Sequence, residues 1–220
     1  SCTAAAGNDG SVTVNAELSL GARSLRPVLH ASVSYKFAAD GSVTPAMKVT
    51  VREGQPMLPR FGLRLIMPYG TEYIRYFGRG PLESYIDKRL ASKLGVYTTT
   101  ATDNFEHYVR PQESSSHYGC KWAKVTNESG IGFICRAEDF DSFSSNAQHF
   151  TPQMIREAKH DYELEPMKET VLSIDYKMTG TGSGACGPDI DPKYSVNDKM
   201  FNFTFKILPT NTNGIDPFTV

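Results

Sequence analysis

The chain has 220 residues and a mass of 24.3 kDa, enough for one large domain or two small ones with a real hydrophobic core. Its 23 Lys and Arg residues against 24 Asp and Glu residues give a formal net charge of −1, so the basic excess of proteins that bind nucleic acid is missing and no such partner is expected. No stretch approaches 18 consecutive apolar residues and residues 1–10 lack a signal-peptide pattern, so no membrane partner is expected either.

Alternation of apolar and polar residues runs through most of the chain and predicts antiparallel β-strands, each with one apolar face. Residues 11–20 alternate without error, which predicts a half-buried strand, and Asp40-Gly41 suits a tight hairpin turn. The final strand carries Phe residues at every second position, which we interpret as its buried face rather than as a sugar-stacking surface. The predicted strands cover residues 11–20, 29–37, 43–51, 61–67, 172–178 and 201–207.

Helical signals are few. Thr151 is a good N-cap before Pro152, which predicts a helix of at most two turns within 153–160, and residues 87–94 could form a second short helical turn. No βα alternation is visible, which excludes a Rossmann domain or a barrel. The sequence therefore predicts an all-β fold with minimal helix: a single domain over residues 1–220, built as a large antiparallel two-sheet sandwich with its core at about 11–208 and a tail at 209–220.

The cysteines predict neither a zinc site nor a disulfide scaffold. Cys2, Cys120, Cys135 and Cys186 are widely spaced, and no CxxC occurs. Cys120 and Cys135 could face each other across a hairpin that turns near 127–130, but we favour two buried thiols. The histidines and acids around the short helix also match no known ligand spacing, so no metal is predicted.

The segment 73–89, YIRYFGRGPLESYIDKR, is more specific than the rest of the chain, because two glycines and a proline force a turn that is followed by regularly spaced acidic and aromatic residues. This pattern resembles the opening motif of the C-terminal, small-chain domain of family 2 β-galactosidases. The residues that carry the resemblance are Phe77, Gly78, Gly80, Pro81, Glu83, Tyr85, Asp87 and Lys88.

Further matches follow in the order that this family requires. Residues 59–63 resemble the strand that enters the motif. Tyr108, Pro111 and Glu113, with Trp122, resemble a Tyr-x-x-Pro-x-Glu segment, and His160 begins a His-x-x-Glu-Leu element. The resemblance covers about residues 11–208, so it extends over nearly the whole chain.

The resemblance implies a sandwich of the galactose-mutarotase-like type, a supersandwich attached to the end of a multidomain retaining glycosidase. Retaining hydrolysis needs two carboxyl groups about 5 Å apart, and the family carries both on a barrel outside this chain. The resemblance thus implies no catalytic residue here and no activity for the isolated chain. Its implied partners are the barrel of the same polypeptide and a galactoside substrate, with a homo-oligomer of the parent also open. No cofactor is implied in this chain, and Mg and Na are left to the parent's other domains.

In this family a loop of the domain reaches into the sugar site. In one branch it reads Gly-Gly-Asp-x-Ser-Trp, whereas this chain has GSGACGP at 182–188, without the tryptophan. That form looks like the one used by another branch of the family. The candidate substrate-loop residues are therefore Gly184, Cys186, Gly187 and Pro188. The motif residues around Pro81, together with Pro111, Glu113, Trp122 and His160, are expected to be structural.

Two alternatives remain open. A free-standing sugar mutarotase or epimerase would need a histidine and a carboxylate on one concave face, and Glu83, Asp87, Glu113, His107, His117 and His160 are the groups available. A stand-alone carbohydrate-binding module would bind sugar without any barrel. We favour a structural role for Glu83 and Asp87, which would anchor the loop after Pro81 by accepting backbone amides or by pairing with Arg79 or Arg89.

Localisation is weakly constrained. The chain begins at Ser1 without Met, as a piece of a longer polypeptide would, so missing targeting signals say little about the parent. A cytoplasmic place is favoured, with a secreted or periplasmic one left open.

Overall fold

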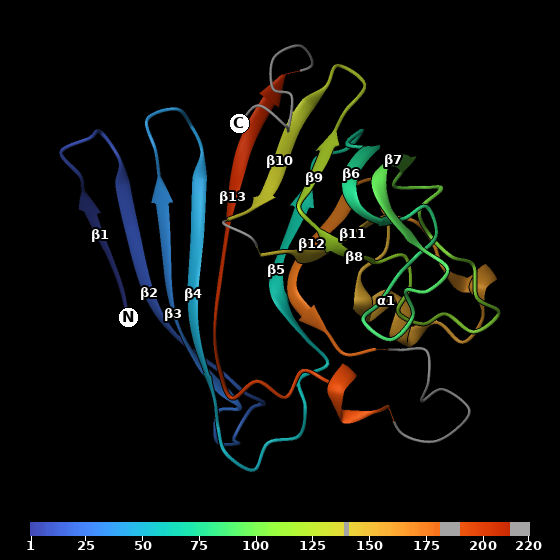
Figure 1. Cartoon of the computed structure of the whole chain (residues 1–220), viewed down its shortest axis with the longest axis horizontal. Helices are drawn as coiled ribbons and strands as arrows, with labels where there is room; N and C mark the ends of the chain where they lie inside the picture. The colour runs from blue at the N-terminus through green and yellow to red at the C-terminus, as the bar shows by residue number, and fades with distance from the viewer. Residues whose placement is uncertain (139–140, 181–189, 212–220) are drawn as a thin grey trace.

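The computed structural model describes residues 1–138, 141–180 and 190–211, and over these residues the fold is nearly all β (Figure 1). Among these residues, thirteen strands form two sheets in which the paired strands run antiparallel. The predicted all-β, two-sheet sandwich is confirmed.

The larger sheet has nine strands. Their order across the sheet is β1 (Cys2–Ala6), β2 (Val12–Leu20), β3 (Leu29–Phe37), β4 (Val43–Val51), β13 (Met200–Asn211), β10 (Ile131–Ala137), β9 (Trp122–Thr126), β6 (Tyr73–Gly80) and β7 (Lys93–Thr100). The last strand of the described chain, β13, therefore lies in the middle of this sheet, between the N-terminal strands and β10. Figure 1 shows it in red between the blue and yellow strands.

The smaller sheet has four strands and packs on the body of the larger one. Its order is β5 (Arg60–Met67), β12 (Thr170–Met178), β11 (Phe143–Gln148) and β8 (His117–Cys120). One apolar cluster joins the two sheets: Val49 and Phe205 of the larger sheet share it with Leu172 and Ile174 of the smaller one. The alternating Phe residues of β13 are buried in this core, as predicted.

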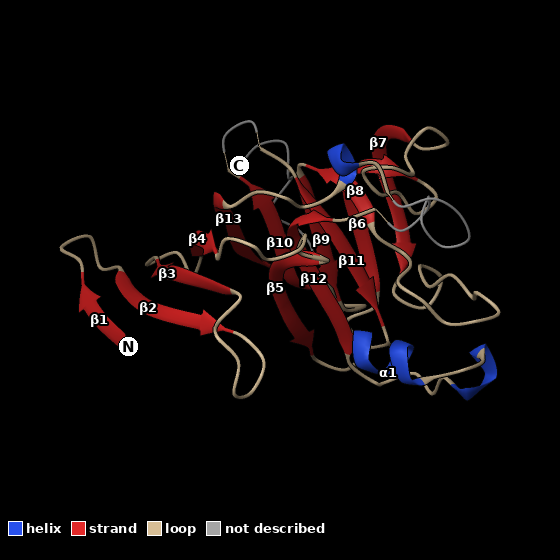
Figure 2. Cartoon of the chain, turned by 90° about the horizontal axis from the view of Figure 1, so that it is seen from below, coloured by secondary structure: helices blue, strands red, loops and turns tan. Residues whose placement is uncertain are grey.

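Strands β1 to β3 extend beyond the smaller sheet, and we call them the wing (Figure 2). The register places Ala16, Leu18 and Leu20 of β2 on the same face as the buried residues Val33, Ala31 and Leu29 of β3. The prediction that β2 is half-buried is wrong at this point, because the side chains of Val12, Leu18 and Leu20 are 42–45 % exposed. The apolar face is present, but the smaller sheet does not reach it.

The predicted helix is present as α1 (Pro152–Glu157), with the Thr151 hydroxyl accepting the Met154 amide at 3.2 Å. Two 3-10 turns, η1 (Asp161–Glu163) and η2 (Pro192–Tyr194), were not predicted. The helical turn expected at 87–94 is wrong, because residues 87–92 form irregular turns and β7 begins at Lys93. Among the described residues, no helix is long and apolar enough to cross a membrane.

Three of the four cysteines lie within the described residues, and all three are free thiols, as predicted. Cys120 and Cys135 are completely buried in the core. Burial raises the pKa of each of these thiols to about 12. The hairpin expected near 127–130 is confirmed, since the Asn127 amide donates to the Ile131 carbonyl at 2.9 Å.

Candidate functional site

A layer of buried polar side chains covers the face of the smaller sheet that points away from the apolar core. Asn146 of β11 and Asp175 of β12 lie on this face, opposite in register to Ser173 and Ser144 respectively. The Asn146 amide donates to the Ser114 carbonyl at 2.8 Å, and the Asn104 amide donates to the Ala147 carbonyl at 3.1 Å. The segment that follows β7 is therefore fastened to this face by side-chain hydrogen bonds.

Arg60, at the start of β5, joins two acids within this layer. Its guanidinium donates to both oxygens of Asp175, at 3.2 and 2.5 Å, and to Glu113 at 3.1 Å. The exposed fractions of the three side chains are low, at 20 % for Arg60, 23 % for Glu113 and 4 % for Asp175. One cation thus serves two carboxylates in a poorly solvated place.

The pKa values of the acids in this layer reflect the presence of one cation for two buried carboxylates. Burial raises the pKa of Glu113 and of Asp175 above their ordinary values, and the guanidinium of Arg60 offsets only part of that rise. Burial also raises the pKa of the Tyr85 phenol well above its usual range, and the charge of Glu113 adds to the effect. The cluster is therefore short of positive charge, which favours protonated forms of its acids.

Glu83 fastens the loop that follows the cis Gly80-Pro81 bond. Its carboxylate accepts the Ser115 amide at 2.7 Å and the Tyr108 hydroxyl at 2.5 Å, and it forms an ion pair with Lys88. The predicted anchoring through a backbone amide is confirmed. The expected alternative, a pairing with Arg79 or Arg89, is not the one that Glu83 adopts, because its ionic partner is Lys88.

The two arginines of this segment have other contacts. Arg79 donates to the Ser92 carbonyl at 3.1 Å, and the guanidinium of Arg89 lies 5.3 Å from the centre of the Tyr118 ring. Tyr85 and Pro111 are buried. A side chain at Gly78 would meet the Sγ atom of Cys120 at 2.6 Å, so this motif position has room only for glycine.

Asp87 lies at the base of the candidate substrate loop. Its carboxylate occupies the space where a Cβ on Gly180 would lie. Gly180 is the last described residue before 181–189. The candidate residues Gly184, Cys186, Gly187 and Pro188 lie outside the described residues, so the structure describes the stems of this segment and not the segment itself.

The two stems are held together by hydrogen bonds around Thr179. Its hydroxyl donates to the Leu58 carbonyl at 2.8 Å and accepts the Val196 amide at 3.0 Å, and its own amide donates to the Pro59 carbonyl at 2.9 Å. The Gly180 amide donates to the Tyr194 carbonyl at 3.3 Å. Thr179 and Gly180, before the 181–189 segment, are thus joined to Val196 and Tyr194, which follow it.

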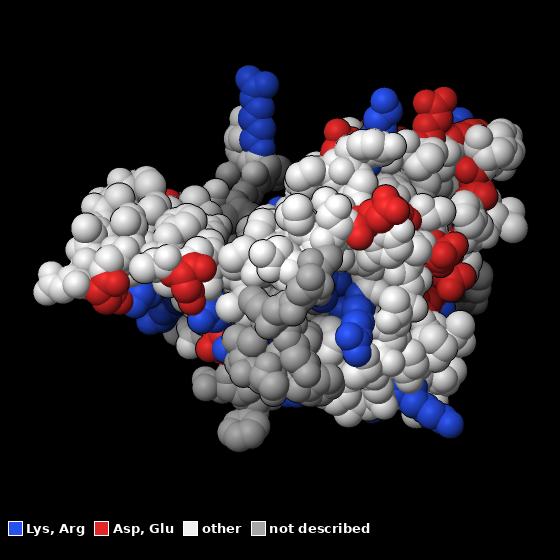
Figure 3. Space-filling view, turned by 90° about the horizontal axis from the view of Figure 1, so that it is seen from above, with Lys and Arg blue, Asp and Glu red and all other residues white. Residues whose placement is uncertain are grey.

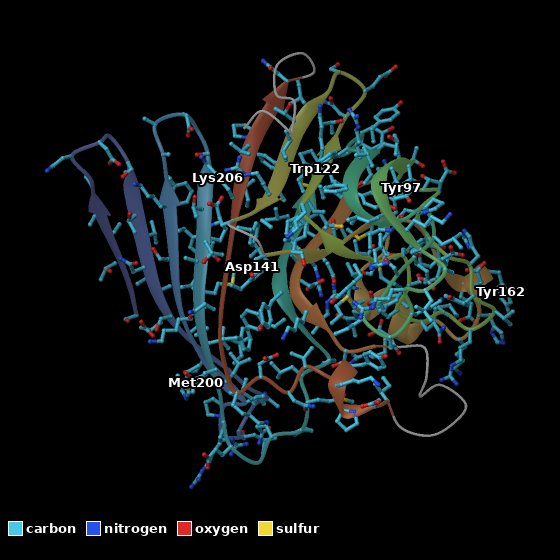
Figure 4. The ribbon with its side chains drawn as sticks, in the orientation of Figure 1. Tyr97, Trp122, Asp141, Tyr162, Met200 and Lys206 are labelled. Carbon is cyan, nitrogen blue, oxygen red and sulfur yellow. The ribbon has the colours of Figure 1, made fainter. Side chains whose placement is uncertain are left out.

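Two residues singled out in the sequence do not join this cluster. Trp122 packs with Ile134 and Leu208 in a separate small apolar cluster on the larger sheet, and Figure 4 shows it on β9. His160 is half-exposed near α1, where its Nδ1 lies 3.0 Å from Glu163. Neither position contacts the stems of the 181–189 segment among the interactions that the structure describes.

The histidines that an epimerase would need are engaged elsewhere. His117 is buried, its Nε2 lies 2.8 Å from the Asn104 side-chain oxygen, and its ring stacks on Tyr76. Burial lowers its pKa to about 4, so it is neutral near pH 7. His107 pairs with Asp161 at 2.9 Å, at the other end of the smaller sheet from Arg60.

Sequence analysis did not identify Arg60, Asn146 and Asp175 as members of the site. Asp175 gave no signal of its own, because it occupies a polar position of the alternating strand 172–178, between Ser173 and Lys177. Arg60 and Asp175 are 115 positions apart, and only the pairing of β5 with β12 brings them together. Within residues 1–138, 141–180 and 190–211, no group of three or more His, Cys, Asp or Glu side chains is placed to hold a metal ion.

Comparison with known proteins identifies the family to which the chain belongs. A family model described as the β-galactosidase small chain matches residues 2–207. The chain is 37 % identical over 181 residues to a β-galactosidase of Actinobacillus pleuropneumoniae and 35 % identical over 181 residues to one of Staphylococcus xylosus. These matches cover 82 % of the chain but only 17 % and 18 % of the relatives, so the chain spans less than a fifth of their length. A β-galactosidase of Priestia megaterium is 25 % identical over 179 residues.

Proposed function

The chain belongs to the β-galactosidase small-chain family, and from that premise we propose that it is an accessory β-sandwich of a β-galactosidase polypeptide. In this proposal, hydrolysis of terminal β-galactosides with retention is carried out by a carboxylate pair outside this chain. The chain docks against the catalytic part and places the segment 181–189 at the sugar site.

The observation that carries the docking role is the uncovered apolar face of β2, within the wing. Its residues continue the core without a break: the buried Leu29, Ala31 and Val33 of β3 are followed by Leu20, Leu18 and Ala16 of β2 in the same register. The opposite face carries Asn15, Glu17 and Ser19. Such an extended apolar face is typical of a contact surface.

The occupant that we propose for this face is the remaining part of the same polypeptide. Two facts support it: the relatives are more than five times as long as the matched segment, and the apolar character of the face suits a permanent partner. Figure 3 shows acidic side chains gathered over one side of the sandwich body, away from the wing, and a few acidic and basic side chains close together beside the wing.

The sugar-site role is supported by the frame beneath the 181–189 segment. The hydrogen bonds around Thr179 and the Arg60–Asp175 pair fix both stems, and a functional loop needs such support to reach its ligand reproducibly. The cluster itself is proposed to be structural.

The proposal is tested first by activity. The isolated 220-residue chain should neither hydrolyse a chromogenic β-galactoside nor accelerate mutarotation of α-galactose followed by polarimetry, whereas the full polypeptide should hydrolyse the galactoside. Turnover by the purified chain, after removal of contaminating enzyme, would contradict the accessory role. Accelerated mutarotation would favour the epimerase alternative.

The docking role is tested in the full polypeptide with two matched substitutions on β2. Leu18→Asp puts a charge on the apolar face, and Asn15→Asp puts the same charge on the polar face. We expect Leu18→Asp to lower activity and to make the domain more sensitive to proteolysis, while Asn15→Asp leaves both unchanged. Equal behaviour of the two variants would show that the wing face is not an interface.

A further inference from the structure

A groove of about 860 Å³ lies at the end of the sandwich opposite to the 181–189 stems. Its walls include residues that follow β5, precede β12 and begin β6, whereas the stems adjoin the start of β5 and the end of β12. The nine-residue strand β12 (Thr170–Met178) separates the two places by roughly 25 Å at 3.3 Å per residue. The groove is therefore a different place from the proposed sugar site.

Aromatic side chains form much of the groove. The side chains of Tyr69 and Tyr73 are 78 % and 46 % exposed, and both residues line the groove rather than the wing or the apolar core. Phe105 and Phe150 form a buried floor, with their ring centres 4.4 Å apart. Two exposed tyrosines above an apolar floor offer flat surfaces against which a ligand with an apolar face can stack.

Two histidine–carboxylate pairs line the same groove. His149 Nε2 lies 2.8 Å from Glu72, and His149 Nδ1 lies 3.0 Å from the Glu169 carbonyl, so both ring nitrogens face acceptors. The second oxygen of Glu72 accepts the Thr102 amide at 2.9 Å. His107 pairs with both oxygens of Asp161, at 2.9 and 3.0 Å. These carboxylates are held in place and keep lone pairs for further hydrogen bonds.

The balance of charge in the groove narrows the class of ligand. A histidine already accompanies each of the carboxylates of Glu72 and Asp161, which weakens their attraction for a cation. The remaining charged residues, Glu128 and Lys168, are of opposite sign, so an anion gains little. A neutral ligand with several hydroxyl groups and an apolar ring face fits both the fixed acceptors and the tyrosines. The volume is within the usual range for small-molecule sites.

We propose that this groove is a second saccharide-binding site, which takes a neutral mono- or disaccharide between Tyr69, Tyr73 and the Glu72–His149 pair. This second site goes beyond the proposed function. It would bind sugar without a carboxylate pair for hydrolysis, and it lies away from the site that the 181–189 segment would serve. Affinity is expected in the millimolar range, as is usual for an open, solvent-exposed groove with few contacts.

The test uses fluorine NMR on the full polypeptide, with fluorotyrosine placed at one position at a time. Tyr69 and Tyr73 report on the groove. Tyr162 is the matched control, because it is 82 % exposed and lies beyond α1, outside the groove lining (Figure 4). The probes are methyl α-galactoside and methyl α-glucoside, which a β-galactosidase does not consume. We expect the signals of Tyr69 and Tyr73 to shift with one common dissociation constant and that of Tyr162 to stay constant.

A second measurement uses variants. Glu72→Gln should weaken the affinity several-fold while the tyrosine signals still shift, and Tyr73→Ala should weaken the affinity seen at Tyr69 by about tenfold. Unmoved signals at Tyr69 and Tyr73 with both sugars, or equal shifts at Tyr162, would overturn the site. Hydrolytic activity is not a readout here, so failure of this proposal is distinct from failure of the accessory role.

Discussion

The carboxylate of Asp87 lies against the backbone of Gly180, in the space that a side chain at position 180 would fill. The two residues come from the motif after β6 and from the stem of the 181–189 segment. The motif therefore lies directly against the base of this segment, and a change on one side is transmitted to the other by contact.

Gly180→Ala should destabilise the chain by about 1–3 kcal/mol, because the added methyl group has to displace the Asp87 carboxylate. Asp87→Ala is the matched second variant, since it clears the space. In denaturant unfolding, the double variant should lose at least about 1 kcal/mol less than the sum of the two single losses. Additive losses would contradict the contact. In the full polypeptide, the two single variants and the double variant should also change KM for a β-galactoside in a non-additive way if the segment serves the sugar site.

Arg60→Met should destabilise the chain by about 3–5 kcal/mol near neutral pH, because it leaves Glu113 and Asp175 buried without their cation. Adding Glu113→Gln and Asp175→Asn should recover much of the loss. The free energy of unfolding, measured with denaturant, provides the test. A loss below about 1 kcal/mol would mean that the cluster is better solvated than its burial indicates.

The same cluster sets a pH dependence. The folded-state pKa values of Glu113 and Asp175 are raised, so their contribution to stability is complete below the unfolded-state pKa and is lost as pH rises through the folded-state pKa. The penalty of Arg60→Met should therefore shrink as pH is lowered, because the two acids take up protons more readily without the guanidinium. Unfolding curves of the two proteins at several pH values measure this difference, and a penalty that grows in acid would contradict it.

His117 predicts an opposite trend. Burial lowers its pKa from 6.5 to about 4, so its contribution to stability is complete above pH 6.5 and is lost as pH falls to about 4. The total effect is about 3 kcal/mol. His117→Gln, which keeps a donor for Asn104, should flatten the decline of unfolding free energy over this range. An unchanged pH slope in the variant would contradict the assignment.

The thiols offer a test of packing. In a Cys186→Ser background, a maleimide should label Cys2 of the native chain rapidly, because Cys2 is exposed. Cys120 and Cys135 should react only after unfolding, since burial raises their pKa to about 12 and excludes the reagent. Mass spectrometry of the labelled peptides counts the adducts. Labelling of all three thiols at one rate would show that the core opens readily.

Local patterns were enough to predict the long strands, since alternation in 29–37 or 201–207 depends only on neighbouring residues. They could not predict that β2 stays uncovered, because alternation identifies an apolar face without saying what packs on it. They also missed several strands, among them β1, β7, β8 and β11. Cys2–Ala6 consists mostly of alanine, which has little β-propensity. β7 carries Val96 and Thr98 to Thr100, whose β-branched side chains favour a strand, but the expectation of a helical turn at 87–94 overlapped its start.

The site was predictable only in part, for a similar reason. Glu83 and Asp87 belong to the compact motif that carries the family resemblance, so the sequence was enough to single them out. The partners of Glu113 come from β5 and β11, far away in sequence, and the pairing of strands decides which residues meet. The register shift of β12 between Asp175 and Lys177 is one example of what alternation does not reveal.

The central place of β13 has a consequence for how the chain acquires its structure. Strands β1 to β4 connect to the rest of the nine-stranded sheet only through β13, which is made last among the described strands. During synthesis, the first four strands can form hairpins early but must wait for some 150 further residues before they join the body. The exposed edge of β4 is thus open to wrong pairing throughout that interval, which makes translation speed and chaperone access relevant to the yield of this protein.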